Sequence, residues 1–309
     1  MRESTIPQRP FGRHQDRVSI LGIGGYHLGT IATQKESTAV VRTAIDAGVT
    51  FMDNAWDYNE GVSEIRMGKA LKGCRDQVFL MTKVCTHGRD GRTAMRQLEE
   101  SLSRLQTDHL DLWQIHECVY YDEPELHFAR GGVVEALDKA RQQGKVRYVG
   151  FTGHKDPAIH LRMLAHDYPF DSCQLPLNGF DASFHSFEQQ VLPELNRRGI
   201  APIGMKSLGG DGGPISRKAV KVADALRYAM SLPVATTVSG IDSLAVLKQN
   251  LKIASTFKPM TASEMAAYRA RCARWAGDGR FELYKTSAQY DGDEGRKHHG
   301  FPTRQDMAV

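Results

Sequence analysis

The sequence contains no run of about 18 consecutive apolar residues, the length that a transmembrane helix requires. The N-terminal stretch MRESTIPQRPFGRHQDR is polar and has no apolar core of the kind that marks a secretory signal peptide. From these two absences we expect a cytoplasmic protein with no membrane partner.

Cysteine is scarce, with five residues in 309, at positions 74, 85, 118, 173 and 272. Their number is odd and no CxxC pair occurs, so the sequence suggests neither a disulfide framework nor a cysteine-rich zinc or iron–sulfur site. We interpret them as small buried apolar residues in a reducing compartment. We therefore expect no bound metal.

A large excess of charge of either sign is also missing. The 40 Lys and Arg residues nearly balance the 36 Asp and Glu residues, which gives a formal net charge of +4. Nucleic-acid-binding proteins normally show a concentrated basic stripe, so we expect no nucleic-acid partner. Hydrophobic residues at 41% and charged residues at 25% are ordinary for a globular protein and leave the oligomeric state open.

The sequence does contain a regular series of short apolar segments, each bounded by turn-forming residues. Continuous apolar runs of this length are typical of strands buried on both faces of a sheet. The eight segments cover residues 18–25, 49–55, 77–84, 109–116, 146–153, 171–178, 199–208 and 234–240.

Helical patterns lie between these segments. In residues 36–47, apolar side chains recur at helical spacing, and Gly48 follows as a stop signal. Similar patterns cover residues 63–71, 92–105, 133–143, 158–164, 187–198, 218–230 and 243–254. Eight strands that alternate with helices predict an α/β fold of the (β/α)8 TIM-barrel type.

We expect residues 1–309 to form a single domain with a barrel core over about 18–275. The segment of about 276–309 loses periodicity, and we expect it to form an irregular C-terminal tail over one barrel end. A doubly wound open sheet is the alternative architecture. That fold would typically carry a GxGxxG turn after the first strand, and GIGGYHLGT departs from this pattern.

Four polar residues mark the ends of three consecutive predicted strands. Asp53 ends the second strand and Tyr58 lies in the loop after it, while Lys83 and His116 end the third and fourth strands. In a barrel, functional side chains come from the C-terminal ends of the strands. We therefore expect the four to meet at that end of the barrel, which we call the mouth.

These residue types suit the delivery of a proton to an oxygen on which negative charge develops, a step that hydride addition to a carbonyl requires. A lysine ammonium favours the phenolate, so we expect Lys83 to lower the pKa of Tyr58 below its ordinary value of about 10. Asp53 would hold the lysine in place, and His116 would orient the carbonyl.

The segments FMDNAWDY (51–58), MTKV (81–84) and DLWQIHE (111–117) resemble, in this order, the Asp-Thr-Ala-x-x-Tyr segment, the lysine strand and the histidine strand of the aldo-keto reductase family. Members of that family are NAD(P)H-dependent (β/α)8 barrels. The resemblance runs from about residue 18 to 254. It implies a reversible reduction of an aldehyde or ketone to an alcohol, with Tyr58 as general acid. The implied catalytic tetrad is Asp53, Tyr58, Lys83 and His116.

The resemblance also implies a nicotinamide site on the later strands. Thr152 and Gly153 stand where the family commonly has a Ser-Asn pair, His154 is a possible substitute for the missing amide, and Gln174 matches a glutamine that binds the nicotinamide carboxamide. Met205 stands in place of a stacking aromatic ring. The full set of implied cofactor contacts is Gly25, Thr152, Gly153, His154, Gln174, Met205, Lys206, Ser207, Leu208, Gly209, Gly240, Lys248 and Asn250.

The loop from Lys206 to Gly209 would cradle the pyrophosphate with backbone N–H groups and one cation. Asn250 aligns with the asparagine of the family's adenosine-phosphate site. Gly240 and Val246 stand where a lysine and an arginine usually bind the 2′-phosphate, and Lys248 is close enough in sequence to substitute. We favour NADP(H), because most relatives use it, with NAD(H) as the alternative.

Tyr26, Trp56, Tyr120 and Tyr121 are candidate walls of a pocket for a small-molecule carbonyl or alcohol substrate, although each could equally be a packing aromatic. The long loop 117–132 is a candidate substrate lid. Two other functions stay open. One is a nucleotide-binding regulatory subunit with the same barrel and little turnover. The other is a metal-dependent barrel hydrolase or lyase, which needs a ligand cluster that the residues above do not supply.

Overall fold

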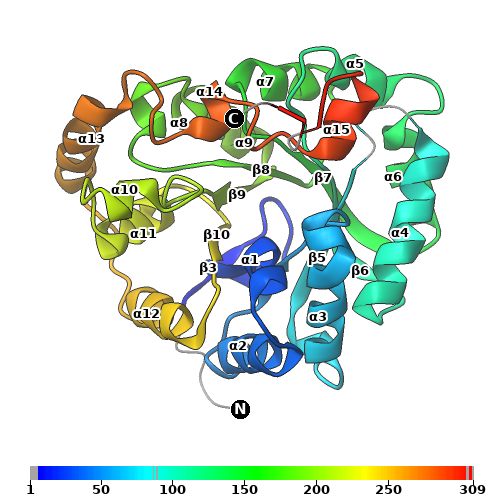
Figure 1. Cartoon of the computed structure of the whole chain (residues 1–309), viewed down its shortest axis with the longest axis horizontal. Helices are drawn as coiled ribbons and strands as arrows, with labels where there is room; N and C mark the ends of the chain where they lie inside the picture. Colours follow the sequence, from blue (N-terminus) through cyan, green and yellow to red (C-terminus); the bar gives the residue numbers. More distant parts are fainter. Residues whose placement is uncertain (1–5, 86, 88–89, 304–305, 308–309) are drawn as a thin grey trace.

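The computed structural model describes residues 6–85, 87, 90–303 and 306–307. Eight parallel strands close into a barrel in the order β10-β3-β4-β5-β6-β7-β8-β9, and helices surround it (Figure 1). The barrel strands are β3 (Leu21–Gly24), β4 (Phe51–Asp53), β5 (Phe79–Val84), β6 (Leu110–Ile115), β7 (Val146–Thr152), β8 (Ser172–Pro176), β9 (Ala201–Met205) and β10 (Thr236–Gly240).

The closure of the sheet decides between the two predicted architectures. β10 pairs in parallel with β3 on one side and with β9 on the other. The sheet therefore closes on itself. The predicted (β/α)8 barrel is confirmed, and the doubly wound open sheet is wrong.

The first predicted strand segment is divided between two elements. Its start belongs to β2 (Arg17–Ser19), which pairs antiparallel with β1 (Gln8–Pro10), and only β3 joins the barrel. Phe11, in the turn of this hairpin, is fully buried, and its ring lies 4.7 Å from that of Phe79 at the start of β5. The hairpin thus plugs the barrel at the end opposite the mouth.

The predicted helices are present, with two differences. Residues 187–198 form two helices rather than one. Pro193 lies in the first turn of the second helix, and inside one continuous helix its ring would clash with the backbone carbonyl of the preceding turn. The helix predicted over 218–230 begins only at Val222. The α-helices are α1 (Gly25–Thr30), α2 (Gln34–Asp46), α3 (Val62–Leu71), α4 (Gly91–Leu105), α5 (Glu123–Phe128), α6 (Val133–Gln142), α7 (Pro157–Ala165), α8 (Phe187–Gln190), α9 (Leu192–Arg198), α10 (Gly213–Ser216), α11 (Val222–Ser231), α12 (Leu244–Ser255), α13 (Ala262–Ala276), α14 (Leu283–Thr286) and α15 (Asp293–His298).

The amphipathic helix α4 illustrates how a helix packs against the barrel with one apolar face. On α4 this face includes Leu98, Leu102 and Leu105, all of which are buried. Three short 3₁₀ segments complete the fold: η1 (Tyr58–Gly61), η2 (Arg75–Gln77) and η3 (Asp181–Ser183). In the described part of the chain, no helix is both long enough and apolar enough to cross a membrane.

The C-terminal tail lies over the mouth, beside the ends of β6 to β9 (Figure 1). The amide of Gly292 donates to Glu117 Oε1 at 2.5 Å, and Lys155 Nζ lies 2.6 Å from Asp291 Oδ1. Its position agrees with the prediction, but the tail is less irregular than expected, because it contains α14 and α15. Residues 304–305 and 308–309 of the predicted tail lie outside the described residues.

A buried lysine anchors the tail. The ammonium of Lys285 lies 2.6 Å from Asp181 Oδ1 and 2.9 Å from Glu282 Oε1, and it donates to the carbonyl of Phe184 at 2.7 Å. Burial raises the pKa of both carboxyl groups, although Lys285 opposes this rise. Without the ammonium, two acidic groups would share a water-poor site with no cation.

We expect Lys285→Met to lower the free energy of unfolding by about 3–5 kcal/mol, the usual effect of removing one partner of a buried ion pair. Urea denaturation at neutral pH measures this. Lys297→Met is the matched control, because Lys297 pairs with Glu294 on the exposed surface of the same tail. The control should change stability by less than about 0.5 kcal/mol. Equal losses in the two variants would contradict the proposed anchor.

Candidate active site

Three of the four predicted catalytic residues are in direct contact at the mouth. The ammonium of Lys83, near the end of β5, donates to Asp53 Oδ1 at 2.5 Å and to the backbone carbonyl of Asn54 at 2.7 Å. It also lies 3.3 Å from the hydroxyl oxygen of Tyr58. Lys83 is only 1% exposed, so these three oxygens take the place of water around its charge.

These contacts determine the direction of each hydrogen bond. An ammonium has three N–H donors and no acceptor. Lys83 therefore donates to Asp53, to the Asn54 carbonyl and to Tyr58, and the Tyr58 oxygen accepts. The phenol keeps its own hydrogen, which is available to another acceptor at the mouth.

The turn that carries Tyr58 is held by the backbone. The Tyr58 amide donates to Ala55 O, and the Trp56 amide donates to Lys83 O, which ties the turn to β5. The turn then passes through left-handed backbone conformations, which end at Gly61 with φ of 85° just before α3. A glycine adopts this conformation without strain.

His116, which directly follows β6, completes the group. Its ring centroid lies 5.6 Å from that of Tyr58 in an edge-to-face arrangement. Its Nδ1 lies 3.2 Å from Asp57 Oδ1. Asp57 was not among the residues predicted from the sequence, although an acidic residue directly before the predicted catalytic phenol was a visible signal.

The electrostatic environment of Tyr58 differs from the expectation. Burial raises the pKa of the phenol well above its ordinary value, and the negative charges of Asp53, Asp57 and Glu117 raise it further. The prediction that the pKa of Tyr58 lies below its ordinary value is therefore wrong, because the effects that raise it outweigh the neighbouring ammonium of Lys83. Lys83 is visible in the sequence motif, whereas the burial of Tyr58 and the carboxylates around it arise only in the folded chain.

The acidic groups near the mouth respond to burial and to their cationic neighbours. Burial raises the pKa of Asp57, but the charges of His116 and Lys83 outweigh it, so that the pKa lies below its ordinary value. Burial raises the pKa of Glu117 despite the opposing charge of His116. The pKa values of Asp57 and Glu117, two carboxyl groups near the mouth, are therefore shifted in opposite directions.

A second set of buried polar side chains lies beside His116. Cys85 Sγ, directly after β5, lies 3.3 Å from His87 Nε2, and His87 Nδ1 lies 2.7 Å from Glu123 Oε1. Burial raises the pKa of the Cys85 thiol well above its ordinary value, and nearby negative charges, including that of Asp57, act in the same direction. The thiol is therefore protonated at neutral pH.

The predicted nicotinamide contacts lie on neighbouring strands. Thr152 at the end of β7 pairs with Gln174 on β8, and both are buried. Among the described residues, no hydrogen-bond partner reaches Gln174 Oε1 or His154 Nε2. Burial holds the pKa of His154 well below its ordinary value, and the charge of Lys206 adds to this, so the imidazole is neutral.

Gly153 has a steric reason to replace the amide residue of the family pattern. A Cβ at this position would lie 2.3 Å from the carbonyl oxygen of Cys118 and 2.8 Å from the ring of His160. The backbone of the loop after β6 therefore occupies the space that a side chain would need.

The predicted pyrophosphate loop follows β9, where Met205 is the last residue. Lys206, Gly209 and Gly210 have positive φ angles of 56°, 80° and 89°. Successive left-handed residues can turn backbone N–H groups toward an anion. Ser207 is buried and Leu208 packs against the main core.

The side chain of Lys206, the first residue of this loop, lies beside the tail. Its ammonium is 5.3 Å from the ring centroid of Tyr284 and 5.6 Å from that of Tyr290. Burial lowers the pKa of Lys206 to about 8, and the charge of Lys83 contributes to this decrease. The lysine therefore keeps most of its positive charge at neutral pH.

The remaining predicted cofactor residues occupy different environments. Asn250 is buried and donates to Ser239 Oγ at 3.0 Å, whereas Lys248, also on α12, is exposed. Gly240 is exposed at the end of β10, where it pairs with Gly24. Gly25 is buried, and a Cβ there would lie 2.5 Å from the carbonyl oxygen of Asp53.

Only some of the predicted pocket aromatics approach the tetrad. The ring of Tyr26 is half exposed and lies 5.6 Å from that of Tyr58, edge to face. Trp56 instead points toward α4, where its indole N–H donates to Glu100 at 2.6 Å. Tyr120 packs against the ring of His299 in the tail, with centroids 4.0 Å apart, and the exposed Tyr121 donates to Asp156.

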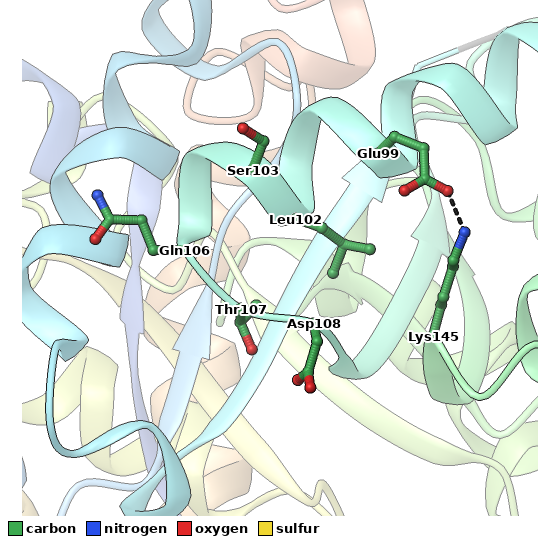
Figure 2. A pocket seen from close by; sticks show the side chains of 7 residues that line it. All are labelled: Glu99, Leu102, Ser103, Gln106, Thr107, Asp108 and Lys145. Atoms are coloured by element: carbon green, nitrogen blue, oxygen red, sulfur yellow. Dashed lines mark hydrogen bonds and ion pairs between the residues drawn. The ribbon is translucent and has the colours of Figure 1, made fainter.

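A separate surface hollow lies away from the tetrad. Figure 2 shows its lining along α4 and in the turn that leads into β6. Lys145, just before β7, forms an ion pair with Glu99 on α4. Asp108 and Lys145 precede β6 and β7, so the hollow lies at the barrel end opposite the mouth. Its lining residues are Glu99, Leu102, Ser103, Gln106, Thr107, Asp108 and Lys145.

Comparisons with known proteins agree with this geometry. A family model described as "Aldo/keto reductase family" matches residues 20–224. The chain is 37% identical to methylglyoxal reductase YeaE of Escherichia coli over 131 residues. This aligned region covers 42% of this chain and 44% of the relative. It is 30% identical to aldo-keto reductase YhdN of Bacillus subtilis over 190 residues, a region that covers 57% of this chain and 54% of that relative. The chain thus spans about half the length of these curated relatives.

Solved structures show the same fold. The holo form of an aldo-keto reductase from Bacillus halodurans matches with a TM-score of 0.73 at 23% identity, covering 90% of this chain and 99% of that one. An aldo-keto reductase from Klebsiella pneumoniae, solved in complex with NADPH, matches with a TM-score of 0.69 at 23% identity, covering 87% and 95%.

We expect Asp57→Asn to lower the pKa of Tyr58, because the substitution removes one of the negative charges that disfavour the phenolate. Titration of ¹³C-labelled tyrosine by NMR measures the change, with Tyr58→Phe to assign the resonance. Glu60→Gln is the matched control, since this carboxylate is exposed on the same turn and solvent screens it. A Tyr58 titration that is unchanged in Asp57→Asn would exclude the assigned cause.

Proposed function

The chain belongs to the aldo/keto reductase family, and we propose that it reduces an aldehyde or ketone to an alcohol by hydride transfer from a nicotinamide cofactor, with Tyr58 as the general acid. The reverse oxidation uses the same residues. The substrate is a small molecule with a carbonyl or alcohol group.

The hydrogen bonds of Lys83 carry this proposal. All three of its N–H groups point at oxygen atoms, so Tyr58 accepts from the lysine and its own O–H is left to donate. The raised pKa of Tyr58 keeps that proton on the oxygen at neutral pH. A general acid must hold its proton until a base of sufficient strength forms, and a carbonyl oxygen becomes such a base as hydride adds to its carbon.

The remaining residues have distinct roles in this mechanism. The bound cofactor supplies the hydride. His116 orients the carbonyl oxygen toward the Tyr58 hydroxyl, and Asp57 at 3.2 Å holds the imidazole. Tyr58 gives its proton to that oxygen, and Lys83 stabilises the phenolate that remains. Asp53 keeps Lys83 charged and in position.

The residues around the mouth fit a nicotinamide cofactor. Gln174 Oε1 and His154 Nε2 are buried without partners among the described residues, which suits hydrogen bonds to a carboxamide. The left-handed loop at Lys206, Gly209 and Gly210 suits a pyrophosphate. Within this site, Thr152 and Met205 would contact the nicotinamide.

We favour NADP(H) over NAD(H). A structural relative was solved with NADPH. Lys248 has an exposed ammonium on the helix that also carries Asn250, two positions away and on a different face of that helix. An ammonium there can attract a 2′-phosphate, which NAD(H) lacks.

We expect Tyr58→Phe to lower kcat for carbonyl reduction by about 10²–10⁴-fold while the dissociation constant for NADPH changes little, because the phenol donates a proton and does not bind the cofactor. NADPH oxidation is measured with a panel of aldehydes and ketones. The panel includes methylglyoxal, for whose reduction one relative is named.

Tyr168→Phe is the control for this experiment, because that hydroxyl donates to Asp138 on the outer surface. It should keep its turnover. Unchanged turnover in Tyr58→Phe would refute the role of general acid. Cofactor binding by the native protein without consumption over the whole panel would favour the nucleotide-binding regulatory subunit instead.

We expect Lys248→Ala to weaken NADPH binding roughly fivefold, as the loss of an exposed charge contact of about 1 kcal/mol implies, and to leave NADH binding unchanged. Lys252→Ala, one turn further along α12, is the control and should affect neither cofactor. Fluorescence titration of the native chain and both variants with NADPH and with NADH measures the dissociation constants. A parallel loss for NADPH and NADH would rule out a 2′-phosphate contact.

A further inference from the structure

Asp57, Cys85 and His116 bring three metal-binding atoms together at the mouth. In the described residues, their ligand atoms all lie within 4.8 Å of one another. They come from three successive strand ends, since Asp57 follows β4, Cys85 follows β5 and His116 follows β6. The parallel register of β5 and β6 brings Cys85 and His116 to neighbouring strand ends, and the turn after β4 brings Asp57 beside them.

The donor set has a chemical preference. One carboxylate oxygen, one thiolate sulfur and one imidazole nitrogen are ligands that Zn²⁺ accepts together, whereas Mg²⁺ and Ca²⁺ prefer oxygen alone. Ligand atoms around a tetrahedral Zn²⁺ lie about 3.5 Å apart, given bonds of about 2.0–2.3 Å. The Asp57 and His116 atoms are already 3.2 Å apart, and the Cys85 sulfur lies within 4.8 Å of both.

Two of the three ligand atoms are available. His116 Nδ1 and Asp57 Oδ1 are buried, and neither has a hydrogen-bond partner of acceptable geometry in the described residues. The two atoms face each other at 3.2 Å. Buried polar atoms of this kind usually have a partner, and a cation between them would supply one.

The surrounding charges favour a cation. Besides Asp57, the carboxylates of Glu117 and Glu294 act on the Cys85 sulfur, and that of Glu123 does so as the partner of His87 at 2.7 Å. Lys83 opposes them, but Asp53 neutralises its charge at 2.5 Å. A divalent ion at this point would therefore lie in a net negative field.

We propose that Asp57, Cys85 and His116 bind Zn²⁺ and that the bound ion blocks carbonyl access to Tyr58. Binding forms a bond from each of the three side chains to the ion. The Cys85 thiol releases its proton to solvent, and no electron is transferred. Water fills the fourth position. Only the blocking effect depends on the proposed reductase function.

Ordinary packing of Cys85 is the competing explanation, and the chain contains a suitable comparison. Cys118 is also buried beside a histidine, with its Sγ 3.5 Å from His127 Nε2, but it does not belong to the three-ligand group. If Cys85 only fills space, the two cysteines should respond alike to a metal.

The test of binding uses the full-length chain after treatment with a chelator. Co²⁺, a spectroscopic substitute for Zn²⁺, is added, and the thiolate-to-Co²⁺ charge-transfer band in the near ultraviolet is recorded. We expect one equivalent of Co²⁺ to produce the band and Zn²⁺ to abolish it. The band should be absent in Cys85→Ser and present in Cys118→Ser. A missing band in the native chain, or a band that survives in Cys85→Ser, overturns the site.

Two further variants are compared with the native chain only after their folding has been verified. Asp57→Asn and Cys85→Ala are checked by circular dichroism and thermal unfolding, and their Zn²⁺ affinity is measured by competition with a chromophoric chelator. Loss of one ligand should weaken affinity by at least about tenfold. Native affinity in a folded Asp57→Asn variant would contradict the assigned ligand set.

The blocking effect is tested separately, by NADPH-dependent turnover with and without Zn²⁺, each variant being compared with its own metal-free rate. The native chain should be inhibited and recover on chelation, and Cys85→Ser should need at least about tenfold more Zn²⁺ for the same inhibition. Loss of turnover on chelation would show that the ion is required and overturn an inhibitory role. If no carbonyl is reduced, the reductase proposal fails, and the Co²⁺ band still decides the site.

Discussion

The buried ammonium of Lys83 is the interaction on which the arrangement of the mouth depends. A charge removed from water needs a compensating partner, and Asp53 on the neighbouring strand provides it at 2.5 Å. The parallel register of β4 and β5 brings the two strand ends together. Because Asp53 and the Asn54 carbonyl take two of the three N–H groups, the third is directed at Tyr58. The compensation of one charge thus fixes the position of the phenol.

Carboxyl groups around this pair determine how the phenol behaves. Asp57 and Glu117 lie close enough to Tyr58 to raise its pKa, in the same direction as burial. The tail contributes to this environment, since the amide of Gly292 donates to the Glu117 carboxylate. The negative potential that keeps the proton on Tyr58 also favours a cation beside His116. The raised pKa of Tyr58 and the proposed metal site at Asp57, Cys85 and His116 therefore have the same cause, the carboxyl groups at the mouth.

Much of the fold was predictable, because alternating apolar strands and amphipathic helices carry a strong periodic signal. The positions of Asp53, Lys83 and His116 followed from the rule that barrel strands end at one mouth, whereas their catalytic roles stay proposals. Side-chain directions in loops were not predictable. Trp56 turns toward α4, and Asp57 turns toward His116, for reasons that depend on contacts distant in sequence. The pKa of Tyr58 was missed for the same reason, since burial cannot be read from a local motif.

The closed barrel has a consequence for the way the chain folds. Its last strand, β10, pairs with its first, β3, so the final seam joins segments from distant parts of the chain. Such long-range contacts form late, because the loop entropy of joining them is high. Asp53 and Lys83 belong to adjacent early strands and can meet while water still reaches both. The charge pair, whose residues are 30 positions apart, therefore closes a much shorter loop of chain than the seam does, and the entropy lost in forming it is smaller.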